Sequence, residues 1–165
     1  RIRADNLPSF HFTDIFQGLQ QPRADGEETG DFVLRRRDQF MSYQLAVSVD
    51  DAAQQITHVI RGSDLITSTP QQLLILAALE QRAPQYGHIP LVVDVAGRKL
   101  SKQNGAAALD THHPGRNLHA ALRCLNQNPP LQLATASAPV VLSWAIAHWQ
   151  RQLVPKYLTV TQLHL

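Results

Sequence analysis

Hydrophobic and polar positions alternate in short stretches over the first 40 residues. In residues 9–18, SFHFTDIFQG, apolar and polar side chains take turns, which is typical of a short strand. Residues 22–31, PRADGEETGD, form a polar, glycine-bearing stretch that predicts a loop. Residues 31–40, DFVLRRRDQF, predict a strand that ends in a charged turn. We therefore expect short strands and turns over residues 1–40.

The pattern over residues 43–53, YQLAVSVDDAA, fits two structures. Alternation of Val47 and Val49 favours a strand, whereas the spacing of Leu45, Val49 and Ala52 favours one face of a helix. The sequence leaves both open.

A strand, a helix and a second strand follow. Residues 55–62, QITHVIRG, are rich in β-branched side chains and end on a glycine. Thr69 before Pro70 is a helix-start signal, and the apolar run after it predicts a helix over 70–82. Residues 88–95, HIPLVVDV, predict the next strand. This succession is the pattern of a parallel α/β unit, in which ligands bind beyond the carboxyl ends of the strands.

Helical periodicity dominates the C-terminal third. We expect one helix over 115–127 and a second over 137–155, with Ser137 as its cap and Pro155 at its end. The stretch between the two helices predicts a loop. A small helical subdomain is the simplest interpretation.

Composition places the chain among globular proteins. Of the 165 residues, 44% are hydrophobic and 17% are charged, so we expect a packed core. No apolar run approaches the roughly 18 residues of a membrane span, and the first residues contain no apolar signal core. The single cysteine, Cys124, excludes an internal disulfide and indicates a reducing, cytoplasmic location. Because the chain opens without Met in a strand-like RIR, we expect it to be the C-terminal part of a longer protein.

Charge is unevenly distributed. The net charge is +2, but no acidic residue follows Asp110, whereas four cations do: Arg116, Arg123, Arg151 and Lys156. This asymmetry fits a polyanionic partner such as RNA. An ordinary helical surface that is poor in acids fits equally well on charge alone.

The stretch GRKLSKQNG, Gly97 to Gly105, holds two of the three lysines, Lys99 and Lys102, with Ser101 between them. A lysine is a compact charge on a flexible stem, and flanking glycines allow such a loop to move over bound phosphates. A surface turn with two solvated lysines is the alternative.

The segment KLSKQ, Lys99 to Gln103, is similar to the KMSKS signature of class I aminoacyl-tRNA synthetases. Residues 42–79 and 88–104 resemble the glutamyl branch of that family in order and spacing, and the short tail resembles its glutamyl-Q tRNA(Asp) synthetases. The resemblance implies an α/β fold: the second half of a Rossmann-like catalytic domain followed by a small helical subdomain. It further implies that residues 1–40 end an inserted acceptor-type region with connecting strands, that 41–105 complete the catalytic domain, and that 106–165 form the helical subdomain.

The resemblance also implies an activity: ATP-dependent activation of L-glutamate and its transfer to queuosine of tRNA(Asp). Tyr43 and Arg61 would bind glutamate, Lys102 would be catalytic, and Lys99, Ser101 and Lys102 would contact ATP with its Mg²⁺. A planar guanidinium suits a carboxylate, and a tyrosine offers one hydroxyl and a flat wall. For Tyr43 a half-buried core position is the alternative.

Other interpretations stay open. Arg61 can instead form a salt bridge to Asp51 or Asp64. The chain can be a fragment of a glutamyl-tRNA synthetase that charges tRNA(Glu), or a non-catalytic RNA-binding remnant.

Two elements of the resembled family are missing. The HIGH-type motif that binds ATP does not occur, and the cysteines of the family's zinc site are expected upstream of residue 1. We therefore expect no metal ligands here, no membrane partner, a monomer, and no adenylation by this part alone. The remaining histidines are expected to pack or to lie on the surface: His58, His88, His119 and His148.

Overall fold

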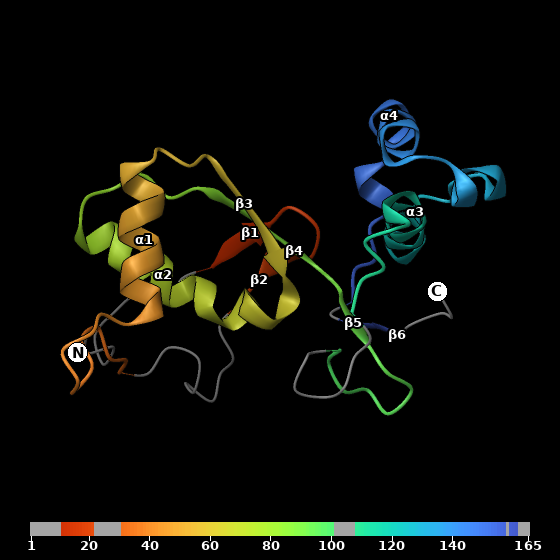
Figure 1. The fold of residues 1–165 in the computed structure, drawn as a ribbon. Coiled ribbons are helices and arrows are strands. Elements are labelled where there is room, and N and C mark those ends of the chain that lie inside the picture. The colour runs from red at the N-terminus through yellow and green to blue at the C-terminus, as the bar shows by residue number, and fades with distance from the viewer. Residues whose placement is uncertain (1–10, 22–30, 101–107, 158, 162–165) are drawn as a thin grey trace. The chain divides into compact units, whose positions relative to one another are not determined.

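The computed structural model describes residues 11–21, 31–100, 108–157 and 159–161. The chain divides into two compact units, residues 1–88 and residues 89–165 (Figure 1). The elements are β1 (Phe12–Asp14), β2 (Gly18–Gln20), α1 (Tyr43–Ala53), β3 (His58–Gly62), the 3-10 helix η1 (Ser63–Ser68), α2 (Thr69–Ala78), β4 (Gln85–Ile89), β5 (Leu91–Val93), α3 (Pro114–Cys124), η3 (Leu131–Thr135), α4 (Ala138–His148), η4 (Arg151–Leu153) and β6 (Thr159–Thr161). The division into an inserted region (1–40), the catalytic domain (41–105) and a helical subdomain (106–165) stays a prediction.

Strands β3 and β4 form the sheet that organises the first unit. The N–H of Gln85, at the start of β4, donates to the carbonyl oxygen of Thr57, just before β3, at 2.9 Å. Both strands therefore start at the same end and run in parallel. Helices η1 and α2 connect them, which confirms the predicted strand–helix–strand order of an α/β fold. The predicted bounds differ: α2 stops at Ala78 instead of residue 82, and the single strand expected over 88–95 is divided into the end of β4 and β5, which belongs to another sheet.

The ambiguous stretch 43–53 is helix α1. The hydroxyl of Ser42 accepts a hydrogen bond from the N–H of Leu45 at 3.4 Å and caps its first turn. The helix packs on α2, as Figure 1 shows, and the half-buried Leu45 contacts a core of Phe32, Leu74 and Ile75. Of the two structures that the sequence left open for this stretch, the helix is therefore the one that forms.

The strand predicted over 31–40 is wrong. This segment forms a tight turn in which the N–H of Arg36 donates to the carbonyl oxygen of Phe40, with Gln39 at φ 71°. Its bridge residues are isolated: Arg35 pairs antiparallel with Met41, and Phe32 is a second single bridge residue. The charged run is exposed to solvent and Arg36 pairs with Asp38, so the chain folds back on itself instead of joining the sheet.

The second unit contains the predicted helices, but both are shorter than expected. Helix α3 ends at Cys124 and α4 ends at His148, with η4 in place of the last predicted turns. The two helices pack on each other. Strand β6 returns to pair in parallel with β5, with Val160 opposite Val92, a pairing that the sequence did not predict. Among the described residues no helix has the length and apolarity needed to cross a membrane.

Candidate functional site

Arg61 and His88 lie side by side at the carboxyl ends of β3 and β4, the end of a parallel sheet where ligands bind. The Arg61 Nε–H donates to His88 Nε2 at 3.0 Å. The Nη2 group donates to the carbonyl oxygen of Leu65 at 3.2 Å and to the hydroxyl oxygen of Thr69 at 2.9 Å. A guanidinium has five N–H donors. Within the described part of the chain, the two on Nη1 have no hydrogen bond, and the side chain is only half-buried.

The aromatic ring of Tyr86 lies beside this guanidinium, with Arg61 Cζ 5.2 Å from the ring centroid. This is a cation–π contact. Burial raises the pKa of Tyr86 to about 12, against the opposing charge of Arg61 and with smaller contributions from Asp51 and Tyr43. The hydroxyl of Tyr86 is therefore neutral, and the ring adds no negative charge to the site.

Asp14 and His88 form a buried pair behind Arg61. The exposed fractions are 2% for Asp14 and 0% for His88, and Asp14 Oδ2 lies 2.6 Å from His88 Nδ1. Burial alone would raise the pKa of Asp14, but the hydrogen bond from the His88 ring and those from the N–H groups of Gln17, His88 and Phe16 together lower it. Asp14 is therefore an ionised carboxylate that can only accept hydrogen bonds.

Tyr43 is the first residue of α1, and 52% of it is exposed. It is not a core aromatic. Tyr43 makes a small electrostatic contribution to the raised pKa of Tyr86, whose ring lies beside Arg61.

No salt bridge joins Arg61 to Asp51 or Asp64 among the described residues. Burial raises the pKa of Asp51, which Arg61 opposes and Asp50 increases. The carboxylate is therefore within electrostatic reach of Arg61 without neutralising it through contact.

The start of the lysine loop is a tight turn in the second unit. Asp94 Oδ1 accepts hydrogen bonds from the N–H groups of Ala96 and Arg98, both at 2.9 Å, and Gly97 has a φ of 76°. Lys99 is exposed and forms an antiparallel bridge with Val93. The other two residues expected to contact ATP, Ser101 and Lys102, lie outside the described residues.

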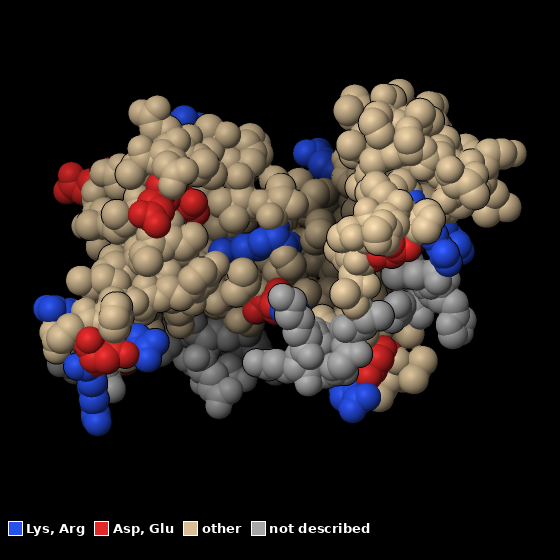
Figure 2. Space-filling view, in the orientation of Figure 1, with Lys and Arg blue, Asp and Glu red and all other residues tan. Residues whose placement is uncertain are grey.

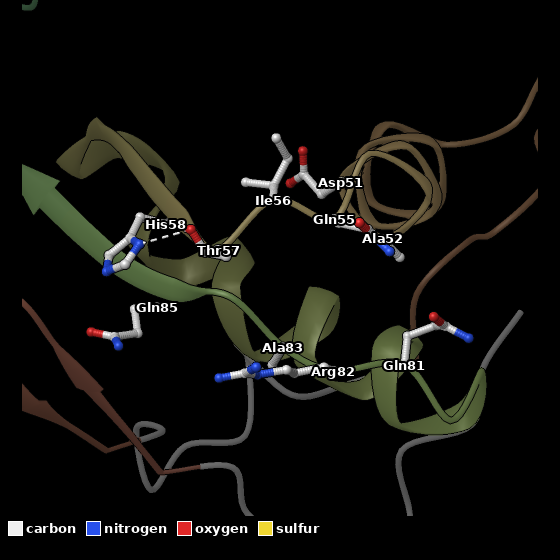
Figure 3. A pocket seen from close by; sticks show the side chains of 10 residues that line it. All are labelled: Asp51, Ala52, Gln55, Ile56, Thr57, His58, Gln81, Arg82, Ala83 and Gln85. Carbon is white, nitrogen blue, oxygen red and sulfur yellow. Dashed lines mark hydrogen bonds between the residues drawn. The ribbon is translucent and has the colours of Figure 1, made fainter.

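A hollow of about 570 Å³ lies at the opposite end of the β3–β4 pair, the amino end (Figure 3). Its lining includes Thr57 just before β3, His58 at the start of β3 and Gln85 at the start of β4. The figure shows one hydrogen bond among the side chains drawn, between the His58 ring and the Thr57 hydroxyl, at 3.0 Å. The other lining residues are Asp51, Ala52, Gln55, Ile56, Gln81, Arg82 and Ala83.

The second unit carries a different surface. Figure 2 shows an uncharged area over α4, because Ala138–His148 contains no Lys, Arg, Asp or Glu. The four cations after Asp110 are all exposed. Among the described residues no group of three His, Cys, Asp or Glu side chains is arranged to hold a metal ion, and Cys124 is a free thiol whose pKa is raised by burial.

Residues 1–119 match the family described as tRNA synthetases class I (E and Q), catalytic domain. The chain therefore belongs to this family, a class of aminoacyl-tRNA synthetase-like ligases, and the resemblance seen in the sequence is confirmed.

Two relatives are glutamyl-Q tRNA(Asp) synthetases by name. The protein of Pseudomonas aeruginosa (strain LESB58) is 42% identical over 165 residues, which are 100% of this chain and 56% of that protein. The protein of Xanthomonas oryzae pv. oryzae (strain KACC10331 / KXO85) is 46% identical over 158 residues, 94% of this chain and 52% of that protein. The chain thus spans about half the length of these relatives.

A crystal structure of glutamate-tRNA synthetase from Elizabethkingia anophelis has the same fold over most of this chain. The TM-score is 0.69 at 21% identity, covering 95% of this chain and 35% of that one. The likeness confirms the predicted fold class.

Sequence reasoning did not assign to this site three residues that contact Arg61, namely Thr69, Tyr86 and His88, nor Asp14, which contacts His88. His88 was expected to serve packing or to lie on the surface, and it is fully buried with both ring nitrogens hydrogen-bonded. One signal in the sequence could have indicated His88: it lies in a predicted strand, close to the end of the sheet where ligands are expected to bind.

Proposed function

We propose that this chain forms part of an enzyme that activates L-glutamate with ATP and transfers it to queuosine of tRNA(Asp). The observation that supports the glutamate site most directly is the state of Arg61. Its guanidinium is held on one side by His88, Thr69 and the carbonyl oxygen of Leu65, and no described residue accepts a hydrogen bond from the two N–H groups of Nη1, which we assign to a ligand. A carboxylate is the complementary acceptor.

In this proposal Arg61 binds the side-chain carboxylate of glutamate, and Tyr43 contributes a hydroxyl and a wall. Glutamine lacks that charge and presents an amide with two donors, so Arg61 would discriminate against it. Lys102 is the catalytic residue, and Lys99 and Ser101 help to hold ATP, whose phosphates carry Mg²⁺ with them.

The proposed reaction has two steps, activation of glutamate and its transfer to the tRNA. The α-carboxylate of glutamate attacks the α-phosphorus of ATP, a carboxylate oxygen–phosphorus bond forms, and pyrophosphate leaves with the electrons of the broken bond. The lysine charge stabilises the negative charge that builds up on the phosphates. A hydroxyl of queuosine then attacks the carbonyl carbon of glutamyl-adenylate, loses its proton, and AMP leaves.

The names of the two relatives support tRNA(Asp) as the acceptor. The four cations after Asp110 are exposed, and no acidic residue follows Asp110, so this part of the chain suits contact with RNA phosphates. We place the enzyme in the cytoplasm as a monomer, and we assign the zinc site of the family to residues outside this chain.

The acceptor is tested with the protein as encoded, including any natural sequence that flanks these residues. Radiolabelled glutamate should become attached to tRNA(Asp) that contains queuosine, and unmodified tRNA(Asp) of the same sequence is the matched control. Labelling of the terminal adenosine of tRNA(Glu), with none on tRNA(Asp), would instead support a glutamyl-tRNA synthetase, the second candidate that the fold likeness favours. Absence of both labels, with RNA binding retained, would favour a non-catalytic module.

A further inference from the structure

We propose that Asp14 and His88 are positioning residues for carboxylate recognition: together they fix the hydrogen-bonding state and the orientation of the Arg61 guanidinium. This inference rests on the proposed function of Arg61 in glutamate binding. It assigns a function to two buried polar residues that contact no substrate themselves.

Both carboxylate oxygens of Asp14 accept hydrogen bonds. Its Oδ1 atom accepts hydrogen bonds from the N–H groups of Phe16 and Gln17, both at 2.9 Å, and of His88, at 3.1 Å. Its Oδ2 atom is left for the His88 ring at 2.6 Å. Since the carboxylate is ionised and only accepts, His88 Nδ1 must carry the hydrogen in this contact.

The contacts of His88 determine which ring nitrogen carries its hydrogen. The Nε–H of Arg61 points at His88 Nε2 at 3.0 Å, and arginine has no acceptor. His88 Nε2 must therefore be without a hydrogen, and the ring is neutral with its single hydrogen on Nδ1. Asp14 determines this tautomer from one side, and Arg61 uses it from the other.

The neutral His88 ring helps to fix the orientation of the Arg61 guanidinium. The guanidinium is fixed by hydrogen bonds to His88, Thr69 and the carbonyl oxygen of Leu65, with the Tyr86 ring beside it. Binding groups that are already oriented lose less conformational entropy when a ligand arrives. The pair thus directs the N–H groups of Nη1 toward a single ligand position.

A purely structural role is the competing explanation, because the pair also ties β1 to β4. Buried polar pairs are often no more stabilising than apolar residues of the same size. The test must therefore measure something that loss of stability alone would not change.

The variant Asp14→Asn provides such a test. The amide oxygen can still accept the three backbone hydrogen bonds, but an N–H₂ group now faces His88 Nδ1. His88 must accept there, its hydrogen moves to Nε2, and two donors confront each other at Arg61. We expect ¹⁵N NMR of the ring to show the Nε2–H tautomer, and the dissociation constant for glutamate to rise about 10-fold. Binding of ATP should stay within about twofold of the parent.

The matched pair His88→Gln and His88→Phe separates hydrogen bonding from ring packing. Glutamine keeps an acceptor for Arg61 Nε, whereas phenylalanine keeps the ring without it. We expect glutamate affinity within about threefold of the parent for glutamine and a loss of about 10-fold for phenylalanine. If Asp14→Asn does not fold, this pair and Thr69→Val, which removes one acceptor of Arg61 Nη2, decide the question.

Unchanged glutamate affinity in folded Asp14→Asn or His88→Phe would overturn the inference, as would an equal loss in His88→Gln and His88→Phe. Arg61→Gln distinguishes this failure from failure of the proposed function. If Arg61→Gln abolishes glutamate binding but the other variants have no effect, Arg61 binds glutamate without help from the pair. If Arg61→Gln has no effect, the proposed glutamate site is wrong, and the inference falls with it.

Discussion

The two ends of the β3–β4 pair differ in shape and in hydrogen bonding. The amino end has a hollow of about 570 Å³ lined by mostly exposed side chains. The carboxyl end has a half-buried arginine held by three hydrogen bonds and a buried Asp–His pair behind it. A concave surface supplies space, but recognition of a charged ligand needs fixed donors, and among the described residues the carboxyl end has an arginine held in place by hydrogen bonds.

The carboxylates at the two ends show the same difference. Asp14, at the carboxyl end, is buried, yet hydrogen bonds lower its pKa. Asp51, which lines the hollow, has its pKa raised, chiefly by burial. Burial acts in the same direction on both, so the surrounding hydrogen-bond donors account for the opposite outcomes.

The largest effect is expected for Arg61→Gln. Loss of a charged donor that faces a carboxylate should weaken glutamate binding by about 100-fold or more, close to 3 kcal/mol. Titration calorimetry measures this directly. The matched control at the amino end is Arg82→Gln, for which we expect less than a twofold change. Equal losses in the two variants would show that the hollow contributes as much to glutamate binding as the carboxyl end, and would contradict the contrast between the two ends.

Next in size is the effect of Asp14→Ala on stability. The change leaves three backbone N–H groups and the His88 ring without their acceptor in a buried site, at a cost of about 3 kcal/mol in the free energy of unfolding. Gln81→Ala, at the exposed rim of the hollow, should cost less than about 0.5 kcal/mol. Urea unfolding of both variants measures the difference. A cost below 1 kcal/mol for Asp14→Ala would contradict the ionised, hydrogen-bonded carboxylate described here.

A smaller effect concerns pH. Because the pKa of Asp14 is lowered in the folded state, its contribution to stability is complete above the ordinary value of 3.8 and is lost as the pH falls through the lowered value. The raised pKa of Asp51 has the opposite sign: its charge costs stability above the raised value, and the cost disappears as the pH falls below 3.8.

The measurement is the free energy of unfolding from pH 2 to pH 7 for the parent, Asp14→Asn and Asp51→Asn. Relative to the parent, Asp14→Asn should be less stable at neutral pH, Asp51→Asn should be slightly more stable, and both differences should shrink in acid. Differences of the same sign at neutral pH would refute the contrast between the two carboxylates.

The smallest effect is expected at Tyr86. Tyr86→Phe keeps the ring beside Arg61, so glutamate affinity should change by less than about twofold. Tyr86→Leu removes the cation–π contact, and a loss of about threefold is expected. If phenylalanine were as damaging as leucine, the hydroxyl rather than the ring would be the important group.

Several features of this chain follow from local sequence. Pro70 lies in the first turn of α2 as predicted, since a proline is suited to a first turn wherever it occurs. Thr69, expected to cap the helix, is instead its first residue, and its hydroxyl accepts a hydrogen bond from Arg61. The family signature in the lysine loop and the block from Ser42 to Leu79 were sufficient to indicate the family. Arg61 and Tyr43 were found in the same way, although their function in binding stays a prediction.

Other features were not accessible from the sequence. Residues 31–40 have the composition of a strand but form a tight turn with isolated bridges, and Thr159–Thr161 became a strand because β5 was available beside it. Strand pairing depends on which backbone groups meet in space, and that information is not contained in a short window of sequence.

By itself, the sequence determined the family, the strand–helix–strand order and the start of α2, because these depend on neighbouring residues and on local backbone preferences. Only the tertiary structure decided that Asp14 and His88, 74 residues apart, share a hydrogen bond, and that Arg61 contacts the other side of the same ring. Long-range packing brings these groups together, and burial then makes each hydrogen bond selective, since a buried donor has no water to replace its partner.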